Sequence, residues 1–263
     1  MRLPVLKILW GMFAFPVMYP GAFLVAAGLP LIAIIAITLV WIAGAVPPGH
    51  QAISWTLLIT YYGLFAWLAV RCHRMILARE EDGVAASPPI VFRLVFRYLA
   101  ALVTATVAKN LFVIVAVTVA LMIFGRNFVP TPETHPPPAP AMNGDLSWVI
   151  DWSMYLAYVP LLYLLARCST LLPAVALGHE WSPGNAWRQT RDNGWRLVLV
   201  VFLLPWSLKA GIDWIYAATE NKLLVGVLAV FTSLITALSV IGLSLSYREL
   251  PPWPAPPPTT PRD

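Results

Sequence analysis

One stretch of sequence decides the fold: ILWGMFAFPVMYPGAFLVAAGLPLIAIIAITLVWIAGAVPPGHQAISWTLLITYYGLFAWLAV, residues Ile8–Val70. Its 63 residues include no Asp, Glu, Lys or Arg. A helix needs about 20 apolar residues to cross a hydrocarbon core about 30 Å thick. The stretch therefore has room for two membrane spans, and the turn signal Pro47-Pro48-Gly49-His50 divides them. Residues 3–15 are too few for a further span, so we predict an interfacial helix there.

The rest of the chain is also apolar. Of the 263 residues, 59% are hydrophobic, and 11% are charged, against roughly 25% in an ordinary soluble domain. Mean hydropathy is +0.75. These values exclude a soluble globular enzyme, a disordered chain and a disulfide scaffold. We predict an all-α polytopic membrane bundle over residues 1–250 and a Pro-rich flexible tail at 251–263. The six predicted spans are about 21–45, 53–70, 98–124, 148–166, 197–217 and 223–247.

Lys and Arg residues divide unevenly between the two sides of these spans. With the N-terminus inside, inner segments carry thirteen of the 17, outer loops carry Arg126 and Lys222, and Lys109 and Lys209 fall within spans. Because positive side chains concentrate on the cytoplasmic side, this asymmetry predicts that both termini are cytoplasmic. The net charge of +5 is spread between apolar spans. It therefore indicates membrane lipids as partners, and not nucleic acid.

An internal repeat is predicted from matching spacings. Tyr62 precedes Arg71-Cys72 by 9 residues, and Tyr158 precedes Arg167-Cys168 by 9. Ser-Pro pairs follow at Ser87 and Ser182, each 6 residues before an arginine. Both Arg-Cys ends would lie inside, so the repeats are expected to be parallel. Ser before Pro also predicts the start of a short helix, because Ser caps free N–H groups and Pro suits the first helical position.

The cytoplasmic segments after these Ser-Pro pairs are rich in arginine, and the second also carries tryptophan. Arginines there would face lipid phosphates, and tryptophans would lie at headgroup level. The residues predicted to bind lipid or a protein partner are Arg93, Arg97, Trp187, Arg188, Arg191, Trp195 and Arg196.

Three charged residues are predicted within the membrane: Lys109, Lys209 and Asp213. Ionisable residues at membrane depth are a functional-site hypothesis by default. Asp213 lies four residues after Lys209, so the two share a helix face. Two interpretations stay open. The lysines either reach outward, with Asp213 neutralising Lys209, or they line an anion, lipid-headgroup or proton site on an inward face.

No enzyme or metal motif is present. The sequence lacks a phosphate loop, Gly-x-Ser-x-Gly, His-Glu-x-x-His and a dinucleotide fingerprint. The cysteines Cys72 and Cys168 are expected to be reduced cytoplasmic thiols. His73 and His179 are interpreted as solvated loop residues, and Glu80-Glu81-Asp82 as a solvated charge cluster. We therefore predict no catalytic residue, metal or cofactor, and a non-enzymatic role is favoured over an enzymatic one.

The segment from Arg167 to Arg196 resembles part of a set of six-span bacterial inner-membrane proteins of unknown function. The shared motifs are Leu-Pro-Ala-x-Ala-Leu at 172–177 and Ala-Trp-x-x-Thr-Arg-x-Asn-x-Trp-Arg at 186–196. More distantly, the arrangement is similar to the membrane domain attached to some glycerophosphodiester phosphodiesterases. The phosphodiesterase catalytic domain has no counterpart here, so its activity is not implied. The resemblance implies the inner membrane of a bacterium.

The sequence leaves two functions open. The first is a non-enzymatic membrane protein that binds anionic lipid, or another membrane protein, through its basic cytoplasmic helices. The alternative is a transporter or permease component that uses Lys109, Lys209 and Asp213. Helices broken beside a midplane charge are typical of transporters, and Pro205 near Lys209 is one such feature.

Overall fold

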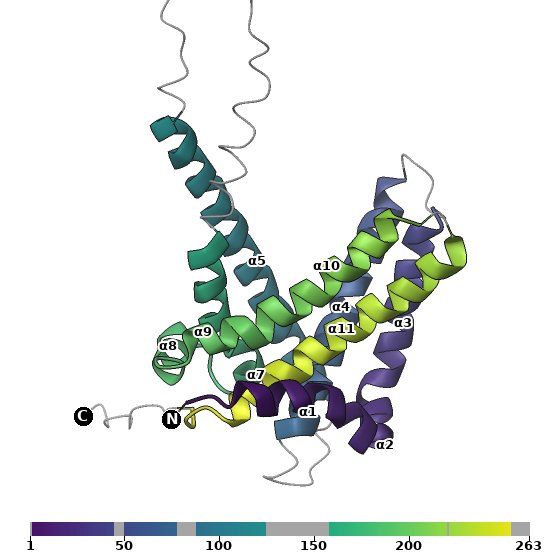
Figure 1. Cartoon of the computed structure of the whole chain (residues 1–263). Coiled ribbons are helices and arrows are strands. Elements are labelled where there is room, and N and C mark those ends of the chain that lie inside the picture. The colour runs from purple at the N-terminus through teal and green to yellow at the C-terminus, as the bar shows by residue number, and fades with distance from the viewer. Residues whose placement is uncertain (1, 45–49, 78–87, 125–157, 220, 254–263) are drawn as a thin grey trace, which may run out of the picture. The chain divides into compact units, whose positions relative to one another are not determined.

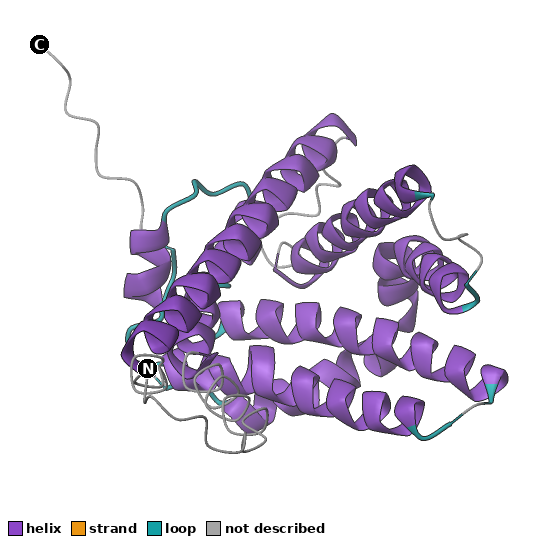
Figure 2. Ribbon diagram, turned by 90° about the horizontal axis from the view of Figure 1, so that it is seen from above, coloured by secondary structure: helices purple, strands orange, loops and turns teal. Residues whose placement is uncertain are grey.

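Most of the residues that the structure describes are helical. The computed structural model describes residues 2–44, 50–77, 88–124, 158–219 and 221–253. Within these ranges it contains helices and turns but no strand, as Figure 2 shows. A helix satisfies its backbone hydrogen bonds internally, which a hydrocarbon environment requires. The predicted all-α fold is confirmed.

Six helical segments of the described chain are long and apolar enough to cross a membrane, which confirms the predicted number. They are Pro20–Ile42, Gln51–Leu77, Val91–Val115, Tyr158–Ala176, Gly194–Ala217 and Leu223–Arg248. The α-helices (Figure 1) are α1 (Val5–Met18), α2 (Pro20–Phe23), α3 (Leu29–Ile42), α4 (Gln51–Leu77), α5 (Pro88–Phe124), α7 (Leu171–Ala176), α8 (Pro183–Gln189), α9 (Gly194–Leu197), α10 (Leu204–Ala217) and α11 (Lys222–Arg248). Two π-helical segments, η1 (Leu24–Gly28) and η3 (Val198–Leu203), complete the order.

Two spans run past their predicted ends. The second continues beyond residue 70 to Leu77, and the fourth continues beyond residue 166 to Ala176. Both predictions stop at the first arginine. A helix need not end at an arginine, because the side chain can bury its aliphatic part while its guanidinium reaches polar partners. The predicted start of the fourth span, at 148, lies outside the described residues.

Each π-helical segment lies just before a proline in a membrane-length helix. Pro30 follows η1 by two residues, and Pro205 follows η3 by two. Proline has no N–H, so it cannot complete the hydrogen bond of the carbonyl four residues earlier. A π turn is one of the local irregularities associated with such kinks. The first and fifth spans thus share the same local irregularity, a π-helical segment just before a proline.

The chain divides into two compact units. The first comprises Met1–Ala101 and Ala166–Asp263, and the second comprises Leu102–Leu165. In the first unit α11 is central, because it packs against α1, α3, α4 and α10. The described part of the second unit includes most of α5, whose large apolar side chains are exposed, Val107 and Leu111 among them.

Helix α1 lies across the end of α11 instead of alongside it (Figure 1). Two glycines permit this close crossing. A Cβ at Gly242 would stand 2.5 Å from Met12 Sδ, and one at Gly11 would stand 2.9 Å from Leu245 Cδ1. Met12 is 1% exposed, so it has little room to move away. We name this part of the first unit, where α1, α8 and the C-terminal ends of α4 and α11 lie, the α1 end.

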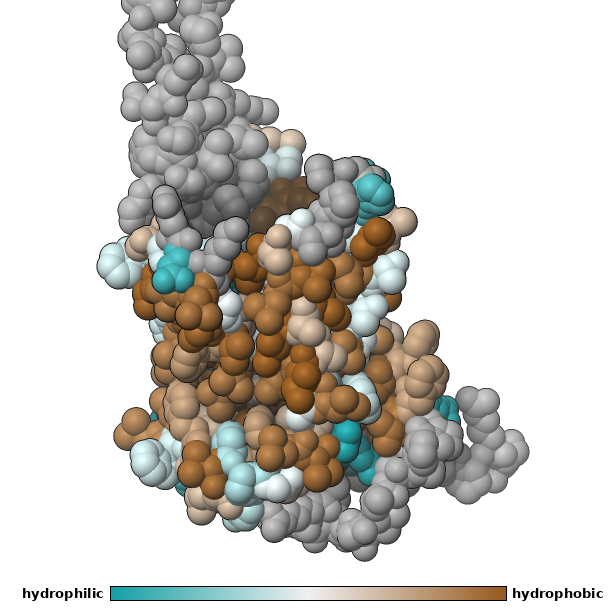
Figure 3. Space-filling model, turned by 90° about the vertical axis from the view of Figure 1, so that its right-hand side faces the viewer, coloured by the Kyte–Doolittle hydropathy of each residue, from teal (hydrophilic) through white to brown (hydrophobic). Residues whose placement is uncertain are grey.

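The surface of the first unit is apolar between its polar ends. Hydrophobic side chains cover the middle of the face in Figure 3, and hydrophilic residues gather above and below them. No residue of α10 is buried, and Trp206 and Trp214 are 64% and 76% exposed. Apolar surface on this scale is unfavourable in water but suits a lipid environment.

Candidate functional site

Helix α8 begins as its sequence predicts. Ser182 has an extended backbone, and its Oγ accepts a hydrogen bond from Asn185 N at 3.3 Å. Pro183 occupies the first helical position. Helix α5 begins at Pro88, the matching position of the proposed repeat, but Ser87 lies outside the described residues. Because α5 is one helix of 37 residues whereas turns separate α8 from α9, the repeat stays a prediction.

A buried arginine holds α8 in place. Arg167 is 4% exposed, and its Nε donates to Thr190 Oγ1 at 3.0 Å. Its Nη2 donates to the backbone oxygen of Trp187, and the guanidinium lies 3.4 Å from the centre of the Trp187 ring. Thr190 Oγ1 in turn donates to Ala186 O at 2.7 Å. Arg167 therefore joins the fourth span to α8 through hydrogen bonds and a cation–π contact.

The end of α8, the turn after it and α9 bind segments from both ends of the described chain. Asn193 Oδ1 accepts from Leu3 N at 2.7 Å, and Arg196 Nη1 donates to Leu3 O at 3.2 Å. Gln189 Nε2 donates to Pro251 O at 2.7 Å. These hydrogen bonds hold the start of α1 next to the chain that follows α11.

The residues predicted to bind lipid or a partner separate into two groups. Arg93, Arg188 and Arg191 are exposed, as are the rings of Trp187 and Trp195, at 42% and 58%. Arg97 and Arg196 are half-buried and donate to backbone oxygens, Arg97 to that of His179 at 3.3 Å. Trp187 has both roles, because its exposed ring also packs on Arg167.

His73 is not the solvated loop residue that the sequence suggests. It is fully buried, because α4 continues through it to Leu77. Its Nδ1 lies 2.7 Å from Ser244 Oγ and its Nε2 lies 3.3 Å from Tyr98 Oη. Ser244 Oγ already donates to Val240 O at 2.8 Å, so it accepts from His73 Nδ1–H, which leaves Nε2 to accept from Tyr98. The histidine is a fully bonded link between α4, α5 and α11.

A helical pattern could have revealed this burial. Ala66, Ala69, Val70, His73 and Ile76 recur at intervals of three or four, and all are buried. This is the spacing of one face of a helix. His179, by contrast, is exposed as expected, and its ring stacks on Trp253 at 6.1 Å.

The predicted Lys209–Asp213 pair forms, but not in the interior. Lys209 Nζ lies 2.5 Å from Asp213 Oδ2, and the two side chains are 50% and 58% exposed. Of the two interpretations, the structure agrees with the outward one, because the pair lies on the apolar outer surface of α10. Lys109 belongs to α5 in the second unit. Its side chain lies outside the described residues, so the role suggested for Lys109 stays a prediction.

Separating this pair is expected to lower the amount of inserted protein. Asp213→Asn leaves a single lysine charge on the apolar face, and a lone charge at mid-membrane costs about 2.5–3.5 kcal/mol on insertion scales. Lys209→Met together with Asp213→Asn should restore abundance, because neither charge remains. Quantitative immunoblotting of membrane fractions measures this. Equal abundance of all three proteins would show that the pair has no structural role.

No group of three His, Cys, Asp or Glu side chains that could hold a metal ion occurs in the ranges that the structure describes. Cys72 is buried and Cys168 is half-buried, and neither is in a disulfide. The Glu80-Glu81-Asp82 cluster lies outside those ranges, as do residues 254–263 of the predicted tail. The described chemistry is thus that of hydrogen-bonded anchors and of exposed arginine and tryptophan.

Comparisons with known proteins do not assign a family to this chain. No protein-family model matches the chain, and no curated protein or solved structure matches it. The resemblance carried by residues 167–196 therefore stays a prediction. What the exposed surface of α8 binds is inferred from its own side chains.

Proposed function

We propose that this chain is a non-enzymatic, multi-pass protein of the bacterial inner membrane that binds anionic lipid. The binding surface consists of the exposed Arg93 at the start of α5, Trp187 and Arg188 of α8, and Arg191 and Trp195 after it. Six membrane-length helices in the described chain support a membrane location. Both termini lie in the cytoplasm in this proposal, and a C-terminal reporter found outside would contradict it.

One observation supports the proposal most directly: one face of α8 is buried against the bundle and the other face is exposed. Ala186, Gln189 and Thr190 are buried against the bundle, whereas Trp187 and Arg188 are exposed. The buried face is tied down by Arg167 and by Pro251. A short helix held so firmly presents Trp187 and Arg188 in a fixed geometry, which lowers the entropy cost of binding a phosphate.

The charge at the α1 end favours lipid over a protein partner. Basic side chains of the first unit gather there, from α1, α8 and the nearby ends of α4, α5 and α11: Lys7, Arg71, Arg74, Arg93, Arg97, Arg167, Arg188, Arg191, Arg196 and Arg248. Each basic residue near an anionic leaflet contributes about 1 kcal/mol of attraction. Exposed tryptophans beside these arginines suit the headgroup region. A lipid surface is also the one partner that an inserted chain always meets.

The test removes the charge of the three exposed arginines. In nanodiscs containing phosphatidylglycerol and phosphatidylethanolamine, the wild type should enrich phosphatidylglycerol around itself. The triple variant Arg93→Gln, Arg188→Gln, Arg191→Gln should lose most of that enrichment, well beyond the roughly fivefold that ~1 kcal/mol of attraction gives for one charge. Lipid mass spectrometry of the isolated nanodiscs measures the ratio.

The triple arginine-to-lysine variant is the matched control, because it keeps the charge and changes only its geometry. It should retain most of the enrichment. Unchanged enrichment in the glutamine variant would reject the proposal. The transporter alternative gains no support from the Lys209–Asp213 pair, which is exposed on a helix with no buried residue.

A further inference from the structure

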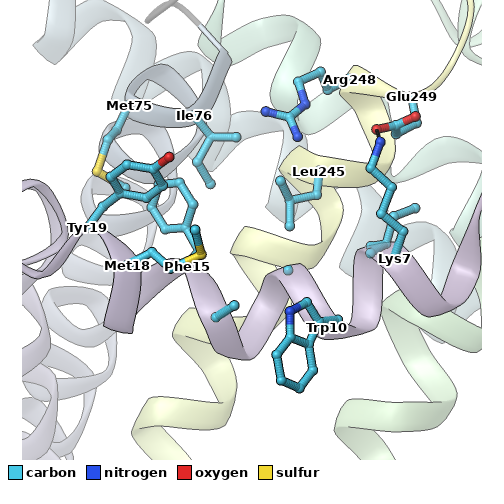
Figure 4. Close-up of a pocket in the computed structure, with 13 residues that line it drawn as sticks. Lys7, Trp10, Phe15, Met18, Tyr19, Met75, Ile76, Leu245, Arg248 and Glu249 are labelled. Carbon is cyan, nitrogen blue, oxygen red and sulfur yellow. Dashed lines mark hydrogen bonds and ion pairs between the residues drawn. The ribbon is translucent and has the colours of Figure 1, made fainter.

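A groove of about 580 Å³ lies between α1 and the C-terminal ends of α4 and α11 (Figure 4). Its apolar wall includes Phe15 and Met18 of α1, Ile76 of α4 and Leu245 of α11. Its polar rim consists of Lys7, Arg248 and Glu249. The groove is thus lined by apolar side chains on one side and by charge on the other.

The crossing of α1 over α11 creates this space. The helices touch closely at Gly11 and Gly242, where a side chain would not fit. From that contact α1 continues toward α4, and the groove fills the angle between them. Its mouth is bordered by Trp10 and Met18, which are 77% and 65% exposed. A molecule from the surrounding lipid can therefore enter from the side.

Of the three charged residues on the rim, Arg248 is the one that can bind an anion without breaking an existing ion pair. Lys7 Nζ lies 2.8 Å from Glu249 Oε1, so these two charges compensate each other. Arg248 is exposed and lines the groove, and its side chain has no hydrogen bond or ion pair with any residue that the structure describes. The rim is therefore positive by one charge.

We propose that this groove binds one acidic phospholipid from the membrane. The phosphodiester contacts Arg248, and an acyl chain lies on Phe15, Met18 and Ile76. The inference rests on the membrane location of the proposed function but uses none of its arginines. A headgroup ammonium gains little, because Glu249 is already paired with Lys7. A free anion would contact only the charged rim, so the apolar wall would contribute nothing to its binding.

Native mass spectrometry of the protein released from phosphatidylglycerol nanodiscs tests this. The wild type should retain one phosphatidylglycerol after bulk lipid is removed. Arg248→Ala should lower that occupancy roughly tenfold, as expected for a lost charge-assisted hydrogen bond. Arg74→Ala is the matched control, since it removes the same charge from the same end of the bundle without touching the groove. It should keep the lipid.

Three further experiments test where the acyl chain lies and whether this site is separate from the surface of α8. Met18→Glu should also lose the lipid, because it places an acid in the path of the acyl chain without disturbing a buried residue. A phosphatidylglycerol with a photoreactive tail should label α1 near Phe15 and α4 near Ile76. The triple variant Arg93→Gln, Arg188→Gln, Arg191→Gln should still retain the single lipid, so this site and the surface of α8 can fail separately.

Several outcomes would overturn the groove assignment. Loss of the lipid in Arg74→Ala equal to that in Arg248→Ala would indicate general charge attraction. Equal retention of phosphatidylethanolamine would remove the acidic preference. Displacement of the lipid by inorganic phosphate would indicate a site for free anions, and labelling confined to other helices would place the lipid elsewhere.

Discussion

Arg167→Met should lower the free energy of unfolding by about 3–5 kcal/mol, since hydrogen bonds to a charged group contribute about 1.5–3 kcal/mol each. The substitution removes the donors to Thr190 and to the Trp187 backbone, and it also removes the stack on the Trp187 ring. Helix α8 then loses its attachment to the fourth span. Thermal unfolding in detergent, followed by tryptophan fluorescence, measures the change.

Two variants show whether this effect belongs to the buried guanidinium. Arg188→Met alters an exposed arginine of α8, and exposed substitutions are usually within about 0.5 kcal/mol of the wild type. Arg167→Lys should not rescue the protein, because an ammonium lacks the planar fork that binds two acceptors and stacks on a ring. An Arg167→Met protein as stable as the wild type would refute the anchoring role.

His73→Leu should also destabilise the protein. Tyr98 then keeps a fully buried hydroxyl without its histidine acceptor, and such a group costs about 1–3 kcal/mol. Ser244 is less affected, since it still donates to Val240. Adding Tyr98→Phe should recover much of the loss, because replacing both partners by apolar groups is nearly neutral.

The same unfolding measurement on the two single variants and the double variant gives the coupling between these side chains. The control is His179→Leu, which alters an exposed histidine and should be close to neutral. If the double variant were destabilised by the full sum of the single effects, His73 and Tyr98 would not act as a pair.

The membrane spans could be predicted because they depend on apolar length alone. The six spans follow from runs that carry few charges, and the structure agrees with their number and order. Their ends are harder to predict, because treating an arginine as the limit of a helix fails at both Arg71 and Arg167. That single assumption also hides the burial of His73, which lies beyond the supposed end of α4.

The polar anchors could not be predicted because their partners are distant in sequence. The Arg167 contact with Thr190 spans 23 residues, and the Asn193 contact with Leu3 spans 190. A charge pattern shows that a segment is basic but not which arginines are buried. Lys209 illustrates the reverse: its pairing with Asp213 follows from helical spacing, whereas the direction of that face depends on packing.

The contact between Leu3 and the turn after α8 sets an order of events during synthesis. A ribosome adds about 5–20 residues per second, so Asn193 and Arg196 follow Leu3 by roughly 10–40 s. Helix α11, which covers Ile8 and Met12, is made later still. Until then the side chains of α1 that α11 covers lack that partner. Helix α1 therefore cannot complete its packing until α11 has been synthesised.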